Sequence, residues 1–168
     1  MINRRASLFA LAALPLSAFL ASPPAHADQT FQRFFPFLID VDGWEGKKPD
    51  GLSMDMPGNS MITATRDYKR GPSQFTAQII VGPVAKGVLA TIGQGMNIET
   101  SDGRIKSSTI DGRKVMLTFA VKDKSGAVMV ALDDNRVLNV TFKGLESDEA
   151  MELAQKFDWK GITAAPTN

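Results

Sequence analysis

The chain has 168 residues, with 19 Lys and Arg against 18 Asp and Glu, a single His and no Cys. This near-neutral charge argues against nucleic-acid binding, which normally needs a basic face, and against simple electrostatic adhesion to anionic membranes. Without Cys there is no disulfide framework, no thiolate nucleophile and no iron–sulfur ligation. Composition therefore indicates a globular protein and excludes several common chemistries.

Residues 1–27 have the pattern of a secretory signal peptide. Arg4 and Arg5 form its charged start, residues 6–21 form an apolar run, and residues 25–27 (Ala-His-Ala) supply a small-x-small cleavage site. We expect cleavage after Ala27, export to the periplasm and a mature chain of 141 residues with a net charge of −1. The arginine pair also resembles part of a twin-arginine motif, but Ser7 replaces the usual aromatic residue, so the general secretory (Sec) route is preferred.

The mature chain is expected to form one domain over residues 28–162, followed by a flexible tail over residues 163–168. A chain of about 140 residues buries enough surface to fold without a disulfide or a structural metal. The mature chain contains no His, because the single His lies in the predicted signal peptide. This excludes serine–histidine triads, cysteine–histidine pairs and ordinary zinc or haem ligation. It also offers no Cys for a lipid anchor and no further apolar run long enough to span a membrane.

The first half of the mature chain predicts an aromatic lead-in followed by strands. Phe31, Phe34 and Phe35 share one face at helical spacing, so residues 28–36 should dock on the domain and cover part of its core. A short strand is expected over residues 37–41. Alternating apolar residues then predict strands over residues 52–56, 61–68 and 73–81, the first with Leu52, Met54 and Met56 on its buried side.

The second half predicts a helix, a strand meander and a terminal helix. Apolar residues at helical spacing from Val84 to Met96 indicate a mid-chain helix that Pro83 can start. Ser147 is expected to cap the terminal helix, which should end near Gly161. The four intervening strands are expected over residues 104–110, 114–122, 127–132 and 136–143, and the buried stripe of the terminal helix is Ala150, Met151, Ala154 and Phe157.

Together these elements predict the α+β class: an antiparallel, twisted sheet of about seven strands with the mid-chain helix and the C-terminal helix packed on it. Their order, with Gly43 and Trp44 after the first strand, resembles the PsbP/Mog1-like α/β/α sandwich from about residue 37 to residue 162. Residues 43–46, 64–68 and 154–158 are also similar to segments of small exported bacterial proteins. The resemblance rests on pattern and topology, and it implies a non-enzymatic accessory or binding role, often beside a larger complex.

A methionine-rich segment has the most specific chemistry. Met54 and Met56 fall on one face of the predicted strand, and Met61 can return to that face after the turn at Pro57 and Gly58. Thioethers are soft ligands that suit Cu(I), so the three methionines form a candidate metal site. The alternative is that they fill the core, because methionine is a common gap-filler and a sheet face needs alternating apolar residues.

A basic stretch around the single tyrosine is the candidate binding site. Arg66, Lys69 and Arg70 surround Tyr68, and two further lysines lie one loop away. Such a cluster can dock an acidic partner or an anionic small molecule, while the alternative is a solvated hairpin end. Trp44 is interpreted either as a cover for the sheet edge or as a side chain that stacks on the ligand.

Three functions are compatible with these residues. The first is an exported, non-catalytic accessory protein that binds a partner protein or a small ligand and needs no cofactor. The second is a periplasmic copper-handling protein that holds Cu(I) with the methionine cluster. The third is a small enzyme whose chemistry relies on carboxylates, since the mature chain lacks His and Cys.

Overall fold

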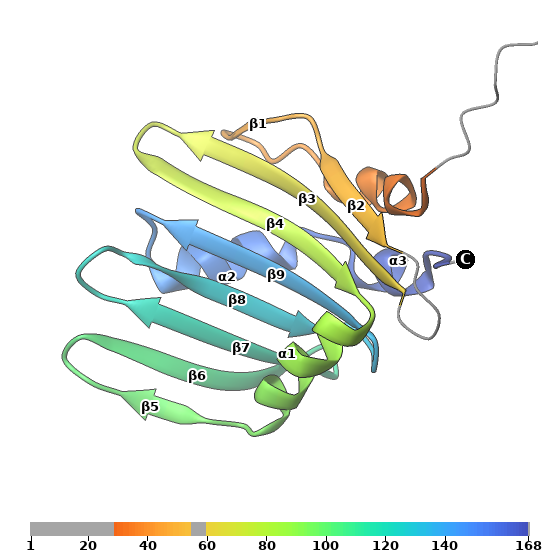
Figure 1. The fold of residues 1–168 in the computed structure, drawn as a ribbon. Helices are drawn as coiled ribbons and strands as arrows, with labels where there is room; N and C mark the ends of the chain where they lie inside the picture. Colours follow the sequence, from red (N-terminus) through yellow and green to blue (C-terminus); the bar gives the residue numbers. More distant parts are fainter. Residues whose placement is uncertain (1–28, 55–59, 168) are drawn as a thin grey trace, which may run out of the picture.

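The computed structural model describes residues 29–54 and 60–167, so the predicted signal peptide and Met56 lie outside the described residues. A 3-10 helix, η1 (Thr30–Phe37), comes first. The helices are α1 (Pro83–Gly93), α2 (Ser147–Gln155) and α3 (Trp159–Ala164). The strands are β1 (Glu45–Gly46), β2 (Asp50–Met54), β3 (Met61–Arg70), β4 (Ser73–Val81), β5 (Asn97–Glu99), β6 (Gly103–Ile110), β7 (Arg113–Ala120), β8 (Ser125–Ala131) and β9 (Arg136–Lys143) (Figure 1).

These strands form one antiparallel sheet in the order β1-β3-β4-β9-β8-β7-β6-β5, and β2 also pairs with β3. The predicted α+β class is therefore confirmed, but the sheet has nine strands rather than about seven. β1 and β5 have only two and three residues, which is too short for a recognisable period. The strand expected over residues 37–41 is wrong, because Phe37 ends η1 and the four residues after it join no strand.

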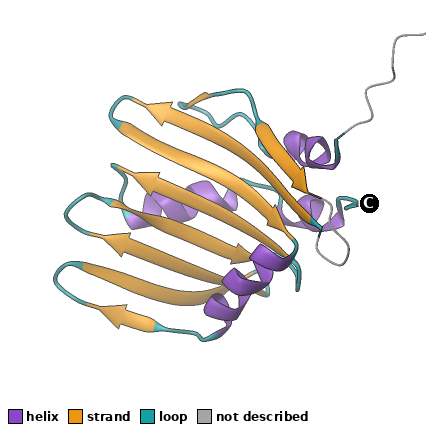
Figure 2. Cartoon of the chain, viewed as in Figure 1, coloured by secondary structure: helices purple, strands orange, loops and turns teal. Residues whose placement is uncertain are grey.

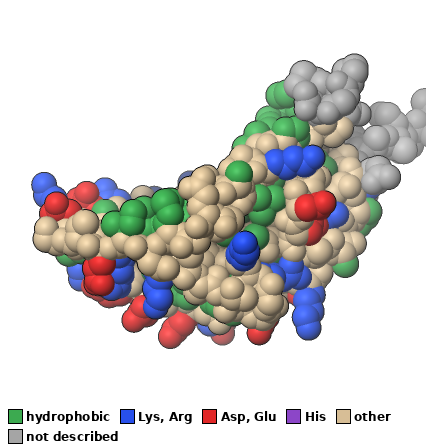
Figure 3. All heavy atoms as spheres, turned by 90° about the horizontal axis from the view of Figure 1, so that it is seen from below, with side chains coloured by type: hydrophobic (Ala, Val, Ile, Leu, Met, Phe, Trp, Pro, Cys, Tyr) green, Lys and Arg blue, Asp and Glu red, His purple; other side chains and the backbone are tan. Residues whose placement is uncertain are grey.

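The two faces of the sheet differ in what packs on them. We call the face that packs against η1, α2 and α3 the covered face, and it carries most of the core, including Ala77, Ile79 and Val140. We call the other face the open face, because α1 crosses only one end of it, over β4, β9, β8 and β7 (Figures 1 and 2). Seen from the β5 side, the molecule is a curved body on which acidic and basic side chains are interspersed (Figure 3).

The central strands show the predicted alternation. Phe75, Ala77, Ile79 and Val81 of β4 are buried on the covered face, and Ile79 pairs with the buried Leu138 of β9. Because strand side chains alternate, the residues between them point to the open face. The pairing of β4 with β9 also joins the first half of the chain to the second within one sheet.

Strand β2 exposes the face that the sequence pattern predicts to be buried. Leu52 and Met54 are 49% and 40% exposed and lie on the open face. Gly51 and Ser53 point the other way, where the backbone N–H of Phe31 donates a hydrogen bond to Ser53 Oγ at 3.1 Å. The aromatic lead-in thus docks on the domain as expected. It packs against the side of β2 that carries Gly51 and Ser53, so the inner face of this strand is the one with small residues.

Helix α1 forms where its period predicts, but its buried stripe is shifted. Gly82 turns the chain into the helix with a φ of 103°, and its N–H donates to the carbonyl of Asn135 at 3.0 Å. Ala85 and Ile92 are buried against the sheet, whereas Val84 is 51% exposed. The helix ends at Gly93, so Met96 at the end of the predicted stripe lies beyond it.

The C-terminal region continues past the helix that the sequence predicts. Ser147 does not cap α2, because it is the first helical residue and its hydroxyl accepts a hydrogen bond from Arg104. The chain turns after α2, and Asp158 caps a separate helix, α3, by accepting from the N–H of Gly161 at 2.9 Å. The fold therefore extends into the segment expected to be a flexible tail, where Ala165 is buried.

Candidate functional site

Arg66, a residue of the predicted binding cluster, is largely enclosed and has backbone partners. Its side chain is 12% exposed, and it donates to the carbonyls of Leu38 and Lys47, each at 2.7 Å. It also forms an ion pair with Asp40. These contacts hold residues 38–47 against β3, so the guanidinium group stabilises a loop.

Tyr68 is also part of the packed interior. Its hydroxyl donates to the carbonyl of Ile39 at 2.8 Å, and its ring stacks on Phe75 with centroids 4.3 Å apart. Burial raises the pKa of this phenol to about 12, which keeps it neutral. Trp44 meets Phe75 edge-on at 4.7 Å, which supports the interpretation of Trp44 as a cover for the sheet.

Arg70 and Lys69 point to opposite faces of the sheet. Arg70 stacks on Trp44 at 4.3 Å and pairs with Glu149 of α2, so it ties the β3–β4 hairpin to a helix on the covered face. Lys69 lies between Arg70 and Tyr68 in the chain and therefore points to the open face. The structure does not gather the five predicted residues into one site, because Lys69 points to the open face while the other four lie on the covered side.

A different set of side chains surrounds Lys69 on the open face. The strand registers place Lys69, Gln74 and Lys143 side by side across β3, β4 and β9, a set that we call the basic row. The neighbouring row of the same strands consists of Asp67, Thr76 and Thr141, which we call the hydroxyl row. The two rows and Lys47 line a depression of about 400 Å³.

Positive charge is in excess in this depression. Asp67 accepts from the hydroxyl of Thr76 at 2.8 Å and pairs with Lys47 at 3.1 Å, and both contacts lower the pKa of its carboxyl group. Asp67 thus neutralises Lys47. Lys69 and Lys143 have no ion-pair partner among residues 29–54 and 60–167. Two ammonium groups with the Thr141 hydroxyl nearby are suited to hold a carboxylate or a phosphate group.

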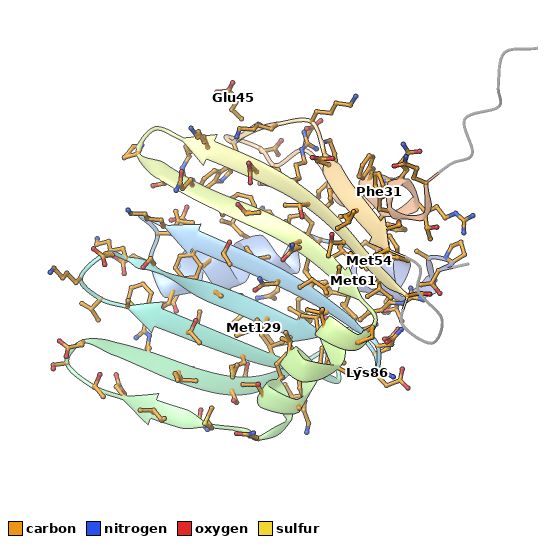
Figure 4. All side chains as sticks on the ribbon, viewed as in Figure 1. Phe31, Glu45, Met54, Met61, Lys86 and Met129 are labelled. Carbon is orange, nitrogen blue, oxygen red and sulfur yellow. The ribbon has the colours of Figure 1, made fainter. Side chains whose placement is uncertain are left out.

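The methionine site is placed in part. Met54 and Met61 are direct partners in the β2–β3 pairing and share the open face, so their side chains lie next to each other (Figure 4). Met56 lies outside the described residues. Within the part of the chain that the structure describes, no three His, Cys, Asp or Glu side chains gather into a group that could hold a metal ion.

Sequence reasoning missed most of the depression. Gln74, Thr76, Thr141 and Lys143 come from strands that are far apart in the chain, and only the β4–β9 register brings them together. A signal was present in both strands, because these polar residues alternate with apolar ones and must share the face opposite the core. What the sequence could not show is which strands are neighbours.

Comparison with protein-family models, with curated proteins and with solved structures found no match. None of the described helices has the length and apolar character needed to cross a membrane. The candidate site therefore has to be interpreted from its own chemistry.

Proposed function

We propose that this chain is an exported, non-catalytic accessory protein that binds an acidic partner protein through the basic row. The observation that carries the proposal is that Lys69 and Lys143, which form no ion pair with any described residue, lie on a sheet face that helices leave largely uncovered. The accessory role itself follows from the resemblance of the sequence pattern to the PsbP/Mog1-like sandwich, which implies a non-enzymatic binding role.

A partner protein fits this depression better than a small ligand does. A small molecule is normally held in an enclosed pocket that buries most of its surface. The depression here lies on an open sheet face, and its two free cations are flexible lysines rather than arginine forks. Contacts of this kind contribute up to about 1 kcal/mol each and are screened by salt, so binding should be modest and salt-dependent.

The test uses a fluorescently labelled hexaglutamate peptide and the purified protein, with fluorescence anisotropy as the measurement. Lys69→Glu together with Lys143→Glu should weaken binding about tenfold, since two attractions become repulsions. The matched control is Lys86→Glu with Lys160→Glu, which changes the net charge equally at exposed sites elsewhere. Equal loss in both double variants would show that binding follows net charge and would contradict the proposal.

Export rests on the sequence of residues 1–27. We propose that the Sec route delivers the chain to the periplasm and that cleavage after Ala27 leaves Asp28 as the first residue. The intact mass of the protein purified from the periplasm tests this directly. A periplasmic protein that retains Arg4 and Arg5 would contradict the proposed cleavage.

We propose Cu(I) binding as a second candidate function, because Met54 and Met61 are adjacent cross-strand partners on an exposed edge. Met116 and Met129 are also direct partners on the open face, so they provide a matched control pair. Competition with a Cu(I) chelator under reducing conditions should give a defined stoichiometry of Cu(I) bound to the protein. The double variant Met54→Leu with Met61→Leu should abolish this binding, and Met116→Leu with Met129→Leu should preserve it. Unchanged binding in the first double variant would rule out this site.

A further inference from the structure

The depression at the basic row continues along the sheet. A second depression, of about 470 Å³, shares Lys47 and Asp67 with the first and is also lined by Leu52, Thr63 and Thr65. Of the five residues that it adds from β2 and β3, Asp50, Leu52, Thr63 and Thr65 point to the open face, and Gly51 has no side chain. The two depressions therefore form one shallow trough that begins at the basic row and follows β3 toward Met61.

The far end of this trough is apolar. Leu52 and Met54 are neighbours on the open face of β2, and they lie opposite Thr63 and Met61. Val84, at the start of α1, is also exposed, and the preceding Gly82 packs against the backbone of Met61. Exposed large apolar side chains that adjoin one another indicate a docking surface, whereas scattered single ones do not.

We propose that the partner contributes an extended segment of about eight residues, acidic at one end and apolar at the other, which lies along β3 on the open face. This inference rests on the proposed function and specifies the chemistry of the partner. The distance from Lys69 to Met61 along β3 is eight residues, or about 26 Å at the rise of a strand. An extended segment of the same length therefore reaches from the basic row to Leu52 and Met54.

The middle of the trough suits a polypeptide backbone. Thr63 and Thr65 line it between the charged and apolar ends, and Gln78 of β4 lies beside Thr65. A hydroxyl group both donates and accepts, so it can satisfy the N–H and C=O groups of an extended chain. The acidic end of the segment is drawn to Lys69 and Lys143 of the basic row, and its apolar end covers side chains that otherwise face water.

The test compares three labelled octapeptides by fluorescence anisotropy. The first peptide has three aspartates followed by five glycine and serine residues. In the second peptide, leucine replaces the last two residues of the first. The third peptide has the composition of the second in scrambled order. Both chain directions of the second peptide are made. We expect the better direction of the second peptide to bind about fivefold more tightly than the first, through burial of leucine side chains, and the scrambled peptide to show no gain.

Variants connect that gain to the apolar end. Leu52→Ser with Met54→Ser should remove the fivefold gain and leave binding of the first peptide, which has no leucine, unchanged. Ile98→Ser with Val121→Ser, at two half-exposed apolar residues elsewhere, is the matched control and should keep the gain. All four positions are exposed, so these substitutions should leave folding intact, which a thermal melt of each variant checks.

The outcomes separate the two proposals. If the first peptide binds but the leucine peptide binds no better, or if the gain survives in Leu52→Ser with Met54→Ser, the inference about the apolar end is wrong and the proposed function stands. If no peptide binds, or if binding does not depend on Lys69 and Lys143, the proposed function itself is wrong. The inference then falls with it.

Discussion

Arg66 stabilises a loop that has no strand partner of its own. Residues 38–44 join neither a helix nor a strand, yet Leu38 and Val41 are buried. The Arg66 guanidinium group donates to the carbonyls of Leu38 and Lys47 and thereby satisfies backbone groups that a strand ladder would otherwise satisfy. An enclosed charge with several hydrogen bonds is costly to change, because the loss leaves the partners unsatisfied.

Arg66→Lys should therefore destabilise the fold by about 2 kcal/mol, since lysine keeps the charge but cannot reach all three acceptors. Urea unfolding followed by circular dichroism measures the free energy of unfolding. Arg70→Lys is the control, because that side chain is more exposed and its ion pair with Glu149 is worth less than about 1 kcal/mol. An equal or larger loss in Arg70→Lys would contradict the structural role given to Arg66.

Tyr68 permits a pH prediction at a single residue, because it is the one tyrosine of the chain. Burial raises its pKa in the folded state to about 12, from an ordinary value of 10.0. The resulting stability is fully present below pH 10.0 and is lost as the pH rises through about 12. Absorbance at 295 nm should show ionisation near 12 in the native protein and near 10 in denaturant. Ionisation near 10 with the fold intact would contradict this.

Among the elements, α3 shows how a short helix gains stability from contacts with the sheet. It has six residues, too few to be stable alone. Asp158 caps it, Ile162 is buried, and the Arg136 guanidinium group donates to the carbonyls of Ile162 and Ala165 at 2.7 Å each. The helix is therefore held by its side-chain cap and by a strand residue, and its last two residues belong to the segment predicted to be a flexible tail.

Ending the chain after Gly161 should destabilise the protein by about 3 kcal/mol or more, through loss of the buried Ile162 and of the two acceptors of Arg136. Thermal unfolding of the truncated and complete chains measures the difference. Pro166→Ser, an exposed position in the same segment, serves as the control and should have little effect. A truncated chain as stable as the complete one would show that α3 does not contribute.

The whole molecule depends on the pairing of β4 with β9, which makes one sheet from both halves of the chain. Trp44 packs on Phe75 in the first half, and Trp159 donates to the carbonyl of Ala154 at 2.8 Å in the second. These are the only two tryptophans of the sequence, so each reports on one half. A shared core predicts that neither half unfolds before the other.

Trp44→Phe and Trp159→Phe leave one reporter each, and urea unfolding of the two variants can be followed by fluorescence and by circular dichroism. Within each variant the two signals should give the same midpoint, as expected for a single cooperative domain. Any difference in midpoint between the variants then reflects the substitutions alone. A fluorescence transition well separated from the circular dichroism transition in either variant would contradict a single domain.

Local periodicity by itself determined the class of fold and several of its elements. The strands around Ile79 and Leu138 and the helix after Gly82 were predictable because each alternates, or repeats every three to four residues, over enough length to be recognised. β1 and β5 are too short for that, and the helical spacing of Phe31, Phe34 and Phe35 does not show that the 3-10 helix continues to Phe37, where a strand is expected to begin.

Only the tertiary structure decided which face of β2 is buried and where the candidate site lies. The apolar alternation of Leu52 and Met54 is the same whether that side meets the core or water, and the docked Phe31 settles it. Lys69 belongs to the binding cluster that the sequence predicts, but its neighbour across β4, Lys143, lies more than 70 residues further along the chain. A sequence pattern shows the periodicity of one segment. A binding surface contains residues from several strands, and only the pairing of the strands decides which residues are neighbours.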